Sequence, residues 1–429
     1  MPTTNRNTDF IARSLAAVWH PCTQMKHHER FPLVPIVKGE GAWLIDAEGK
    51  RYLDAVSSWW VNLFGHANPR INAALKDQLD RLEHAMLAGF THEPAIALSE
   101  RLGKLTGLGH AFYGSDGASA VEIALKMSFH FWRNSGQSDK KKFVSLQGSY
   151  HGETIGALAV TDVAIFRDAY GPLLNNNLLV EFPAGPGAST DSLEQLLSQR
   201  HAEIAALIVE PLVQGAAGMR MYDAAWLTKA RALCTKYGVH LIADEIMTGF
   251  GRTGTLFACE QAGIRPDFMC LSKSITGGYL PLSCVLTTDE IYAAFYDDDV
   301  ARGFLHSHSY TGSALACRAA LATLDIFEED NVIEVNRAKT ARFSARLESL
   351  RRHKRIENFR TTGMIWAFDV KSTNTAFARE FFAAALKRGV LLRPIGRTVY
   401  FMPPYVIDDS EFAFLVEQTL ATIEEIAAS

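Results

Sequence analysis

Short apolar runs recur through the central part of the chain, and helix-length amphipathic segments separate them. Residues 204–209, 239–243 and 268–271 are runs of this kind. Apolar runs of about four to eight residues that alternate with helices are typical of buried parallel strands. The pattern therefore predicts an α/β fold with a mostly parallel, doubly wound sheet. Residues 313–429 interleave strands and helices differently, which indicates a smaller α+β domain.

Charged side chains stand at the ends of two of these runs. Asp244 and Glu245 close the run 239–243, and Lys273 follows the run 268–271. Ligands of open α/β sheets bind at the carboxyl ends of the strands, so a carboxylate and an amine are expected in one cleft. A desolvated lysine attacks carbonyls, and pyridoxal phosphate uses such a lysine together with an anion at its ring nitrogen. We predict that Lys273 bonds to this cofactor and that Asp244 faces its ring; a structural Asp–Lys pair capping two strands is the alternative.

Glycine-rich turns before predicted helices are further candidate contacts. Gly114 and Gly117 let the backbone approach a ligand, and the amides of Gly117 and Ala118, at a helix expected to open near Ser119, suit a phosphate. A plain strand-to-helix turn is the alternative. Tyr150 follows another predicted strand, where an aromatic ring can stack on a cofactor.

Two further features concern substrate binding. Trp59 and Trp60 are adjacent, so on a strand or loop one is expected in the core and the other in a pocket, unless both are core. Arg393 lies in an apolar hairpin predicted from residues 391–396 and 399–405. An arginine in apolar surroundings needs an anion to offset several kcal/mol of desolvation, and either a protein carboxylate or a substrate carboxylate would serve.

Two motifs suggest other chemistry. Gly249, Gly251 and Gly254 match the dinucleotide fingerprint G-x-G-x-x-G, which would indicate a nicotinamide enzyme. We interpret the match as coincidental, because two carboxylates precede it and no long helix is predicted after it. His306 and His308 could ligate a metal, but no third ligand stands at a useful spacing, so a polar loop without metal is expected.

Composition narrows the class of protein. With 429 residues, 48% hydrophobic and 21% charged, the chain is expected to fold into two or three globular domains. The net charge of -4 gives no sign of a nucleic-acid or anionic-membrane partner, and the basic run 140–142 is expected in a solvated loop. Six dispersed cysteines, no apolar run of membrane-spanning length and no signal-like apolar core in residues 1–10 indicate a cytoplasmic protein.

Taken in order along nearly the whole chain, these motifs resemble the class III aminotransferases of pyridoxal-phosphate fold type I. Further segments resemble the branch of that family that aminates 8-amino-7-oxononanoate in biotin synthesis, with S-adenosylmethionine as donor. Met247 stands where many relatives carry glutamine, which argues against the 4-aminobutyrate and ornithine branches. The segments that carry the resemblance are HPCTQ, SSWW, YHGET, VEPLVQGAAGMRMY, ADEIMTGFGRTG, LRPIG and FMPPY.

The resemblance implies a homodimer, in which His308 and Ser309 reach the phosphate of the partner subunit, and it implies that Arg393 binds the carboxylate of the keto acid. Lys273, Asp244 and Tyr150 would be the catalytic residues. The residues implied in cofactor binding are Gly117, Ala118, Tyr150, Asp244, Lys273, His308 and Ser309. The residues implied in substrate binding are Cys22, Trp59, Tyr150, Glu153, Lys273, Ser307 and Arg393. The implied domains are an N-terminal segment 1–65 that packs with the small domain, a large cofactor-binding domain 66–312 and a C-terminal small domain 313–429.

Some positions depart from the best-known pattern of the family. Cys22 replaces a tyrosine expected to stack on the adenine of the donor, so lysine stays open as the donor. The other departures are alanine for serine at Ala118, glutamate for aspartate at Glu153, and histidine and serine for proline and threonine at His308 and Ser309. The remaining alternatives are an aminotransferase for another ω-amino acid with pyruvate or 2-oxoglutarate, a nicotinamide dehydrogenase and a non-catalytic carrier of pyridoxal phosphate.

Overall fold

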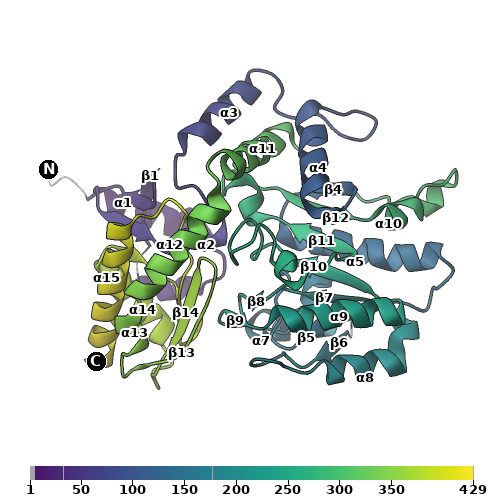
Figure 1. Cartoon of the computed structure of the whole chain (residues 1–429). Coiled ribbons are helices and arrows are strands. Elements are labelled where there is room, and N and C mark those ends of the chain that lie inside the picture. The colour runs from purple at the N-terminus through teal and green to yellow at the C-terminus, as the bar shows by residue number, and fades with distance from the viewer. Residues whose placement is uncertain (1–4, 32, 176, 429) are drawn as a thin grey trace. The chain divides into compact units, whose positions relative to one another are not determined.

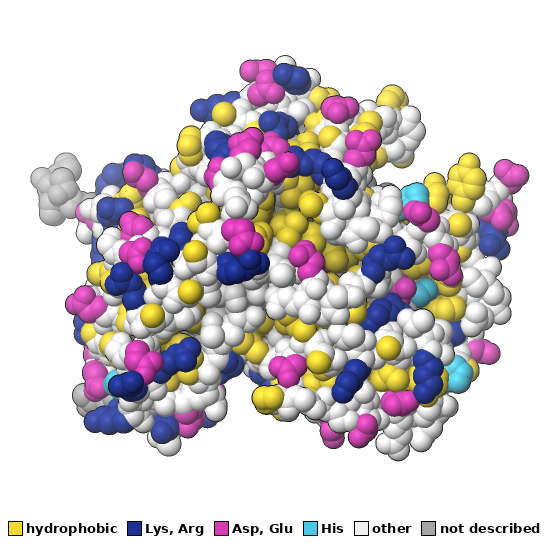
Figure 2. Space-filling model, in the orientation of Figure 1, with side chains coloured by type: hydrophobic (Ala, Val, Ile, Leu, Met, Phe, Trp, Pro, Cys, Tyr) yellow, Lys and Arg dark blue, Asp and Glu magenta, His cyan; other side chains and the backbone are white. Residues whose placement is uncertain are grey.

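The computed structural model of the protein describes residues 5–31, 33–175 and 177–428. Residues 1–4, part of the N-terminal stretch considered above, lie outside this range. Within the described residues, no helix is both long and apolar enough to cross a bilayer. On the face drawn in Figure 2, lysine and arginine are interspersed with aspartate and glutamate, in keeping with the small net charge of -4. Among the cysteines of the described residues, Cys22 is exposed, and the others, Cys234, Cys259, Cys270, Cys284 and Cys317, are buried.

The chain divides into two compact units. The first unit takes in residues 1–69, 339–360 and 365–429, and the second takes in residues 70–338 and 361–364. Helices α3 and α12 and strand β13 contain the points at which the chain passes from one unit to the other. Figure 1 labels the elements of both units.

The second unit is built on a seven-stranded sheet with the order β4-β12-β11-β10-β7-β5-β6. Neighbours from β11 to β6 pair in parallel, whereas β12 runs antiparallel to both β11 and β4. The predicted mostly parallel sheet is therefore confirmed, with one antiparallel strand. A two-stranded antiparallel ribbon, β8 with β9, completes the unit. The strands are β4 (His110–Gly114), β5 (Lys142–Leu146), β6 (Leu178–Val180), β7 (Ile204–Val209), β8 (Val213–Gln214), β9 (Arg220–Met221), β10 (His240–Asp244), β11 (Phe268–Leu271) and β12 (Ser283–Thr287).

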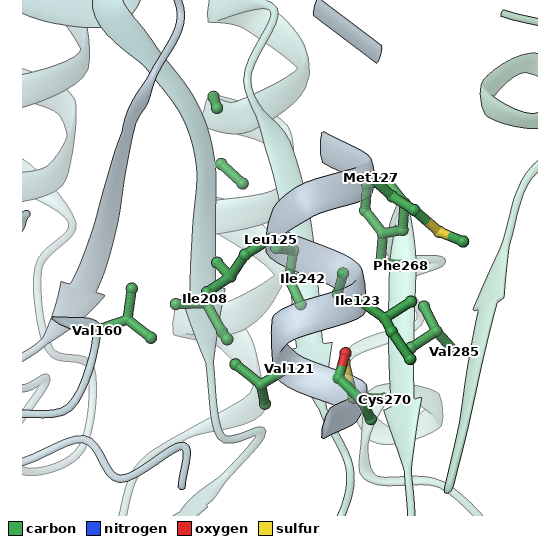
Figure 3. Close-up of a cluster of buried hydrophobic side chains, with 14 of the residues drawn as sticks. Val121, Ile123, Leu125, Met127, Val160, Ile208, Ile242, Phe268, Cys270 and Val285 are labelled. Atoms are coloured by element: carbon green, nitrogen blue, oxygen red, sulfur yellow. The ribbon is translucent and has the colours of Figure 1, made fainter. Parts of the chain in front are cut away.

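Helices cover both faces of this sheet because side chains along a strand alternate between faces. On β7, Ile208 belongs to the core under α5, whereas Leu207 and Val209 belong to the core under α8 and α9. Figure 3 shows the first core, where Val121 and Ile123 of α5 lie among strand residues. The α-helices of the unit are α3 (Pro69–Leu79), α4 (Glu93–Thr106), α5 (Gly117–Asn134), α6 (Ile155–Ala159), α7 (Ala164–Arg167), α8 (Asp191–Arg200), α9 (Ala224–Tyr237), α10 (Asp289–Ala293), α11 (Ala314–Glu329) and, in part, α12 (Val332–Arg346). The 3-10 helices are η2 (Asp168–Leu173), η3 (His201–Glu203), η4 (Ala258–Ala262), η5 (Lys273–Thr276) and η6 (Val300–Arg302).

The expectation of a solvated loop is wrong for the first lysine of the basic run. Lys140 is only 4% exposed. Its Nζ donates to the carbonyls of His201, Ile204 and Gly238 at 2.8, 3.2 and 2.8 Å and lies 4.5 Å from the ring centre of Trp132. Burial lowers the pKa of Lys140 to about 8. The ammonium thus joins three chain segments that are far apart in the sequence.

The first unit contains two small sheets, β1-β2-β3-β15 and β13-β14-β16. Strands β2 and β3 pair antiparallel and form a hairpin with its turn near residue 50. Of the hairpin expected around Arg393, only its tip is present, as an antiparallel bridge between Ile395 and Thr398. The strands on either side do not pair with each other, because β15 pairs in parallel with β3 while β16 pairs with β14. The strands are β1 (Ile36–Glu40), β2 (Trp43–Asp46), β3 (Arg51–Asp54), β13 (Ile356–Thr362), β14 (Ile365–Val370), β15 (Val390–Leu391) and β16 (Thr398–Phe401). The helices are α1 (Arg6–Ala17), η1 (Met25–Glu29), α2 (Ser57–Trp60), α13 (Glu348–Arg351), α14 (Phe377–Lys387) and α15 (Asp409–Ala428).

Candidate active site

Three ionisable side chains lie at the carboxyl ends of adjacent parallel strands in the second unit. Glu210 follows β7, Asp244 ends β10, and Lys273 opens η5 just after β11. Because β10 pairs in parallel with both β7 and β11, these ends share one edge of the sheet. This is the edge at which open α/β sheets bind ligands.

His151 orients Asp244. The carboxylate Oδ2 of Asp244 lies 2.7 Å from Nδ1 of His151, and Oδ1 accepts a hydrogen bond from the amide of Ile246 at 3.2 Å. Asp244 is 4% exposed and His151 is 2% exposed, so the pair is buried. The other ring nitrogen of His151, Nε2, is also buried and has no hydrogen-bond partner among the described residues. The imidazole ring of His151 therefore fixes the orientation of the Asp244 carboxylate.

Glu210 adds a second buried carboxylate behind this pair. Its oxygens accept hydrogen bonds from the backbone amides of Tyr150 at 3.0 Å and Gly215 at 2.9 Å. Burial raises the pKa of Glu210 to about 7; the negative charge of Asp244 acts in the same direction, and His151 opposes it. The charge of this site consequently varies around neutral pH.

Lys273 is partly buried and stands in an unusual backbone conformation. Its φ of 47° is positive, although it is not a glycine. Burial lowers the pKa of Lys273, while Asp244 and Glu210 oppose the shift. A lysine whose pKa is lowered is more often a neutral amine, which is the form that attacks a carbonyl.

The start of α5 can hold an anion. The helix begins at Gly117, two residues before Ser119, and Asp116 caps it by accepting the amide of Ser119 at 2.9 Å. The amides of Gly117 and Ala118 precede the first bonds within the helix and have no partner in the described part of the chain. A Cβ on Gly117 would lie 3.0 Å from a methyl group of Ile246, so a larger residue would have to push this side chain aside.

Tyr150 runs alongside the same helix start. Its hydroxyl donates to Oε1 of Glu153 at 2.9 Å, and its ring centre is 5.3 Å from that of Phe166. Gly152 has a φ of 121°, and a Cβ there would lie 2.6 Å from the Cβ of Ala118. The chain at Tyr150 is therefore packed against the candidate phosphate-binding amides.

A polar loop approaches this helix start in the same chain. Nδ1 of His308 lies 3.2 Å from the hydroxyl of Ser115, and its Nε2 lies 3.2 Å from Nε2 of His306. Nζ of Lys126 lies 2.8 Å from Nδ1 of His306. The loop therefore presents basic groups beside α5. The remaining candidate residues of the loop, both exposed, are Ser307 and Ser309.

Cys22, Trp59 and Arg393 come together in the first unit. The guanidinium carbon of Arg393 lies 4.4 Å from the ring centre of Trp59, and Nη2 donates to the carbonyl of Cys22 at 3.2 Å. The two tryptophans differ as expected, because Trp59 is 41% exposed and Trp60 is 5% exposed. Arg393 is exposed, so the argument from desolvation in an apolar hairpin is wrong. It forms no ion pair with a carboxylate in the described residues, so the N–H groups of its guanidinium are available to bind an anion.

The backbone around Trp59 is strained. Residues 57–60 have φ angles of 51°, 46°, 72° and 73°, all in the left-handed region. The sequence SSWW was expected on a strand or loop, not in a left-handed turn. This conformation costs roughly 1–2 kcal/mol for each residue other than glycine, so the turn stores several kcal/mol. Strain of this kind concentrates at functional sites.

The residues of the second unit fit pyridoxal phosphate. The unbonded amides of Gly117 and Ala118 suit its phosphate, and the lowered pKa of Lys273 suits its aldehyde. Asp244 offers the anion that the ring nitrogen requires, on the same edge as the other groups. No dinucleotide site forms at residues 249–254: they make turns followed only by the short helix η4.

Sequence reasoning assigned no role to two of the residues described here. His151 and Glu210 both stand at strand ends, next to Tyr150 or just after an apolar run, and that position was the available signal. Their partners could not be found without the strand order. Only the order of β5, β7 and β10 brings His151 to Asp244.

Comparison with known proteins defines the class of this chain. The model of the family described as aminotransferase class-III matches residues 24–423. The chain belongs to this family, whose cofactor is pyridoxal phosphate. The adenosylmethionine-8-amino-7-oxononanoate aminotransferase of Helicobacter pylori is 47% identical over 98% of this chain and 99% of its own.

Solved structures agree with this assignment. The adenosylmethionine-8-amino-7-oxononanoate aminotransferase of Methanocaldococcus jannaschii matches with a TM-score of 0.94 and 35% identity, over 98% of this chain and 99% of that one. The omega transaminase of Pseudomonas jessenii in complex with PMP matches with a TM-score of 0.91 and 26% identity, over 97% of this chain and 98% of that one. The fold predicted from the resemblance, that of the pyridoxal-phosphate fold type I, is thereby confirmed.

Proposed function

We propose that the protein transfers an amino group to the ketone of 8-amino-7-oxononanoate, forming 7,8-diaminononanoate for biotin synthesis, with S-adenosylmethionine as the amino donor. The observation that carries the reaction type is the shared strand edge of Lys273, Asp244 and Glu210 in a class III aminotransferase. The substrates are supported by relatives with this name that are 35% to 47% identical over nearly the whole chain.

Three side chains would serve the transfer. When bound, pyridoxal phosphate supplies an aldehyde that accepts the amino group and a ring that draws off the charge left on the donor carbon. Lys273 would hold the cofactor through Nζ and, once displaced as a neutral amine, would move a proton at the donor carbon. Asp244, oriented by His151, would keep a proton on the ring nitrogen. Tyr150 would cover the ring.

Gly117 and Ala118 would bind the phosphate through their backbone amides. These bonds do not depend on a side chain, so alanine in place of serine at Ala118 is compatible with them. The phosphate would gain further contacts from His308 of the partner subunit and Ser309 of the partner subunit. The active site would then be complete only in a homodimer.

Large exposed apolar side chains around the loop support a homodimer. Tyr296, Val300, Leu305 and Tyr310 are between 68% and 79% exposed in the isolated chain. Apolar side chains in such a group favour burial against another subunit. We further propose a cytoplasmic location and the domains 1–65, 66–312 and 313–429.

The resemblance to the family also guides the proposed substrate contacts. Arg393 would bind the carboxylate of the keto acid, because its guanidinium is exposed and unpaired with any carboxylate in the described residues. Trp59 would line the slot for the methylene chain, joined by Ser307. Cys22 and Glu153 would stand at the amino-donor end.

Lysine is a second candidate donor, and one observation favours it. Cys22 offers no aromatic platform for adenine, although its backbone carbonyl is the group that Arg393 contacts. The similarity to an omega transaminase also keeps another ω-amino acid substrate as an outcome of the assay. The three donors can be compared directly on one preparation of the protein.

The test incubates the purified protein with 8-amino-7-oxononanoate and S-adenosylmethionine, lysine or alanine, and measures 7,8-diaminononanoate by mass spectrometry. Formation with S-adenosylmethionine supports the proposal, and formation with lysine alone supports the second donor. No diaminononanoate with any donor, together with transfer of an amino group from an ω-amino acid to pyruvate or 2-oxoglutarate, would exclude the biotin reaction.

Two variants test the residues of the site. Lys273→Ala should abolish both turnover and the visible absorbance of bound pyridoxal phosphate, since no other amine takes its place; turnover at the wild-type rate contradicts the assignment.

Arg393→Ala should chiefly raise KM for the keto acid by about tenfold to a hundredfold, the cost of losing a charged hydrogen-bond pair. An unchanged KM would move the carboxylate site elsewhere.

A further inference from the structure

The left-handed turn at residues 57–60 is held by one buried carboxylate. Asp54 is fully buried, and its Oδ1 accepts the amides of Val56 at 3.3 Å and Ser58 at 2.9 Å. Its Oδ2 accepts the hydroxyl of Ser58 at 2.7 Å and lies 3.0 Å from Nε2 of His66. A single side chain thus binds the backbone before the turn and a residue within it.

Neighbouring groups determine which ring nitrogen of His66 carries the proton. The amide of Gly65 donates to Oδ1 of Asn62 at 2.8 Å, which directs Nδ2 of Asn62 to Nδ1 of His66 at 3.1 Å. Because Nδ2 is a donor, Nδ1 of His66 must accept. The proton is therefore on Nε2, from which His66 donates to Asp54.

The far side of the turn is tied to β16. The hydroxyl of Ser57 donates to the carbonyl of Met402 at 2.7 Å, and Nε1 of Trp60 contacts the hydroxyl of Tyr400 at 3.0 Å. Trp60 is thereby kept in the core, and Trp59 is left on the outside. Hydrogen bonds on both sides offset the backbone strain.

The pairing of strands β3 and β15 also fixes the position of the turn relative to Arg393. Asp54 is the partner of Leu391 in the parallel pairing of β3 with β15, and Arg393 follows two residues later. The turn then brings the ring of Trp59 to 4.4 Å from the guanidinium of Arg393. Asp54 is therefore connected to both partners of the contact: it binds the turn that carries Trp59, and it pairs with the strand that leads to Arg393.

We propose that Asp54 and His66 are positioning residues for substrate binding: they lock the left-handed turn so that Trp59 holds the guanidinium of Arg393 in one plane. This inference rests on the proposed function, in which Arg393 binds the carboxylate of the keto acid. A planar guanidinium recognises a carboxylate through two parallel N–H bonds, so its plane must be fixed before binding. Stacking on a rigid aromatic face removes that ordering cost from the binding step.

The expected signature is a change in KM without an equal change in kcat, because the network does not touch the reacting groups. Asp54→Asn replaces an acceptor with a donor opposite His66 and should raise KM for 8-amino-7-oxononanoate about tenfold or more while kcat changes less than about threefold. The matched control is Asp46→Asn. Asp46 is 3% exposed in the same unit and accepts the hydroxyl of Tyr52 at 2.9 Å and several amides. This control should lower thermal stability and leave KM unchanged.

Two further variants keep the test decisive if Asp54→Asn does not fold. Ser58→Gly removes the hydroxyl bond to Oδ2 of Asp54, keeps the amide bond to Oδ1, and relieves the backbone, since glycine adopts positive φ readily. It should therefore fold and still raise KM. His66→Gln can donate to Asp54 through its amide and should restore most of the affinity that His66→Ala loses. KM values for Asp54→Asn and Ser58→Gly equal to that of the wild type would overturn the positioning role.

Arg393→Ala separates this inference from the proposed function on which it rests. If KM rises in Arg393→Ala but not in the variants of Asp54, Ser58 and His66, only the positioning role is wrong. If KM is unchanged in Arg393→Ala, the carboxylate site is wrong and the positioning role falls with it. If the wild type forms no diaminononanoate, the proposed function itself has failed.

Discussion

Replacing Glu210 with glutamine tests whether the carboxylate behind the strand ends takes up a proton on folding. Burial raises the pKa of Glu210 from the ordinary value of 4.5 to about 7. The folded protein then binds this proton more tightly than the unfolded chain does. The stability that Glu210 contributes is therefore fully present below about pH 4.5 and is lost as the pH rises through about 7. Between pH 5 and pH 8 the loss amounts to about 2.5 kcal/mol.

The assay is urea unfolding of the wild type and Glu210→Gln at pH 5 and pH 8. Glutamine does not titrate, but it turns an NH2 group towards the amide of Tyr150 or Gly215, at a roughly constant cost of about 1–3 kcal/mol. The advantage of the wild type over the variant should therefore shrink by about 2.5 kcal/mol from pH 5 to pH 8. Taking the difference between the two proteins cancels the effect of the titrating groups that do not interact with Glu210.

The control is Ile208→Val in the strand that precedes Glu210. It removes one buried methyl group, at a cost of about 0.5–1.5 kcal/mol that does not depend on pH. If the difference between wild type and Glu210→Gln is as constant as that of the control, the reasoning is refuted. The two backbone amides would then outweigh burial and keep Glu210 ionised at both pH values.

Other variants test the contacts that surround the site and the core. His151→Ala removes the donor to Asp244 and should lower kcat about tenfold to a hundredfold, while His151→Asn, whose amide can replace Nδ1, should recover part of it in steady-state assays; equal losses would contradict the hydrogen-bond role. Lys140→Met leaves three carbonyls without their donor and should lower the free energy of unfolding by about 2–4 kcal/mol in urea, and a loss below about 0.5 kcal/mol would show that water replaces the ammonium. Gly363→Ala places a Cβ 2.3 Å from the carbonyl carbon of Thr253 at a φ of 51°, so thermal unfolding should show a loss above about 3 kcal/mol; a melting temperature equal to that of the wild type would mean that this backbone yields.

The part of the structure that follows from local patterns was predictable. The apolar runs before Asp244 and Lys273 are buried strands, because four or five consecutive apolar residues bury both faces of a strand. The helix α9 precedes β10, so the parallel pairing of β10 with β7 was predictable, whereas only turns and the short helix η4 lie between β10 and β11. The glycine at position 117 indicated a close approach of the backbone, although α5 begins two residues earlier than expected.

Features that depend on distant pairing were not predictable. Lys140 reads as part of a solvated basic run, since the three carbonyls that bind it come from segments far along the chain. The apolar residues around Arg393 suggested a hairpin, yet the two strands join different sheets. The turn at SSWW opposes the intrinsic preference of its residues, so only its partners, Asp54 among them, explain it.

The helix α5, whose first amides we propose as the phosphate-binding groups, also contributes to the core of the second unit. Nine-tenths or more of each of Val121, Ile123, Leu125 and Phe131 is shielded from water, and all belong to one core. Figure 3 labels the first three of them. Because α5 is packed against the sheet through these side chains, the helix can be displaced only when the sheet unfolds. On heating, bleaching of the yellow colour and collapse of the domain should therefore occur as a single event, and added pyridoxal phosphate should delay both together.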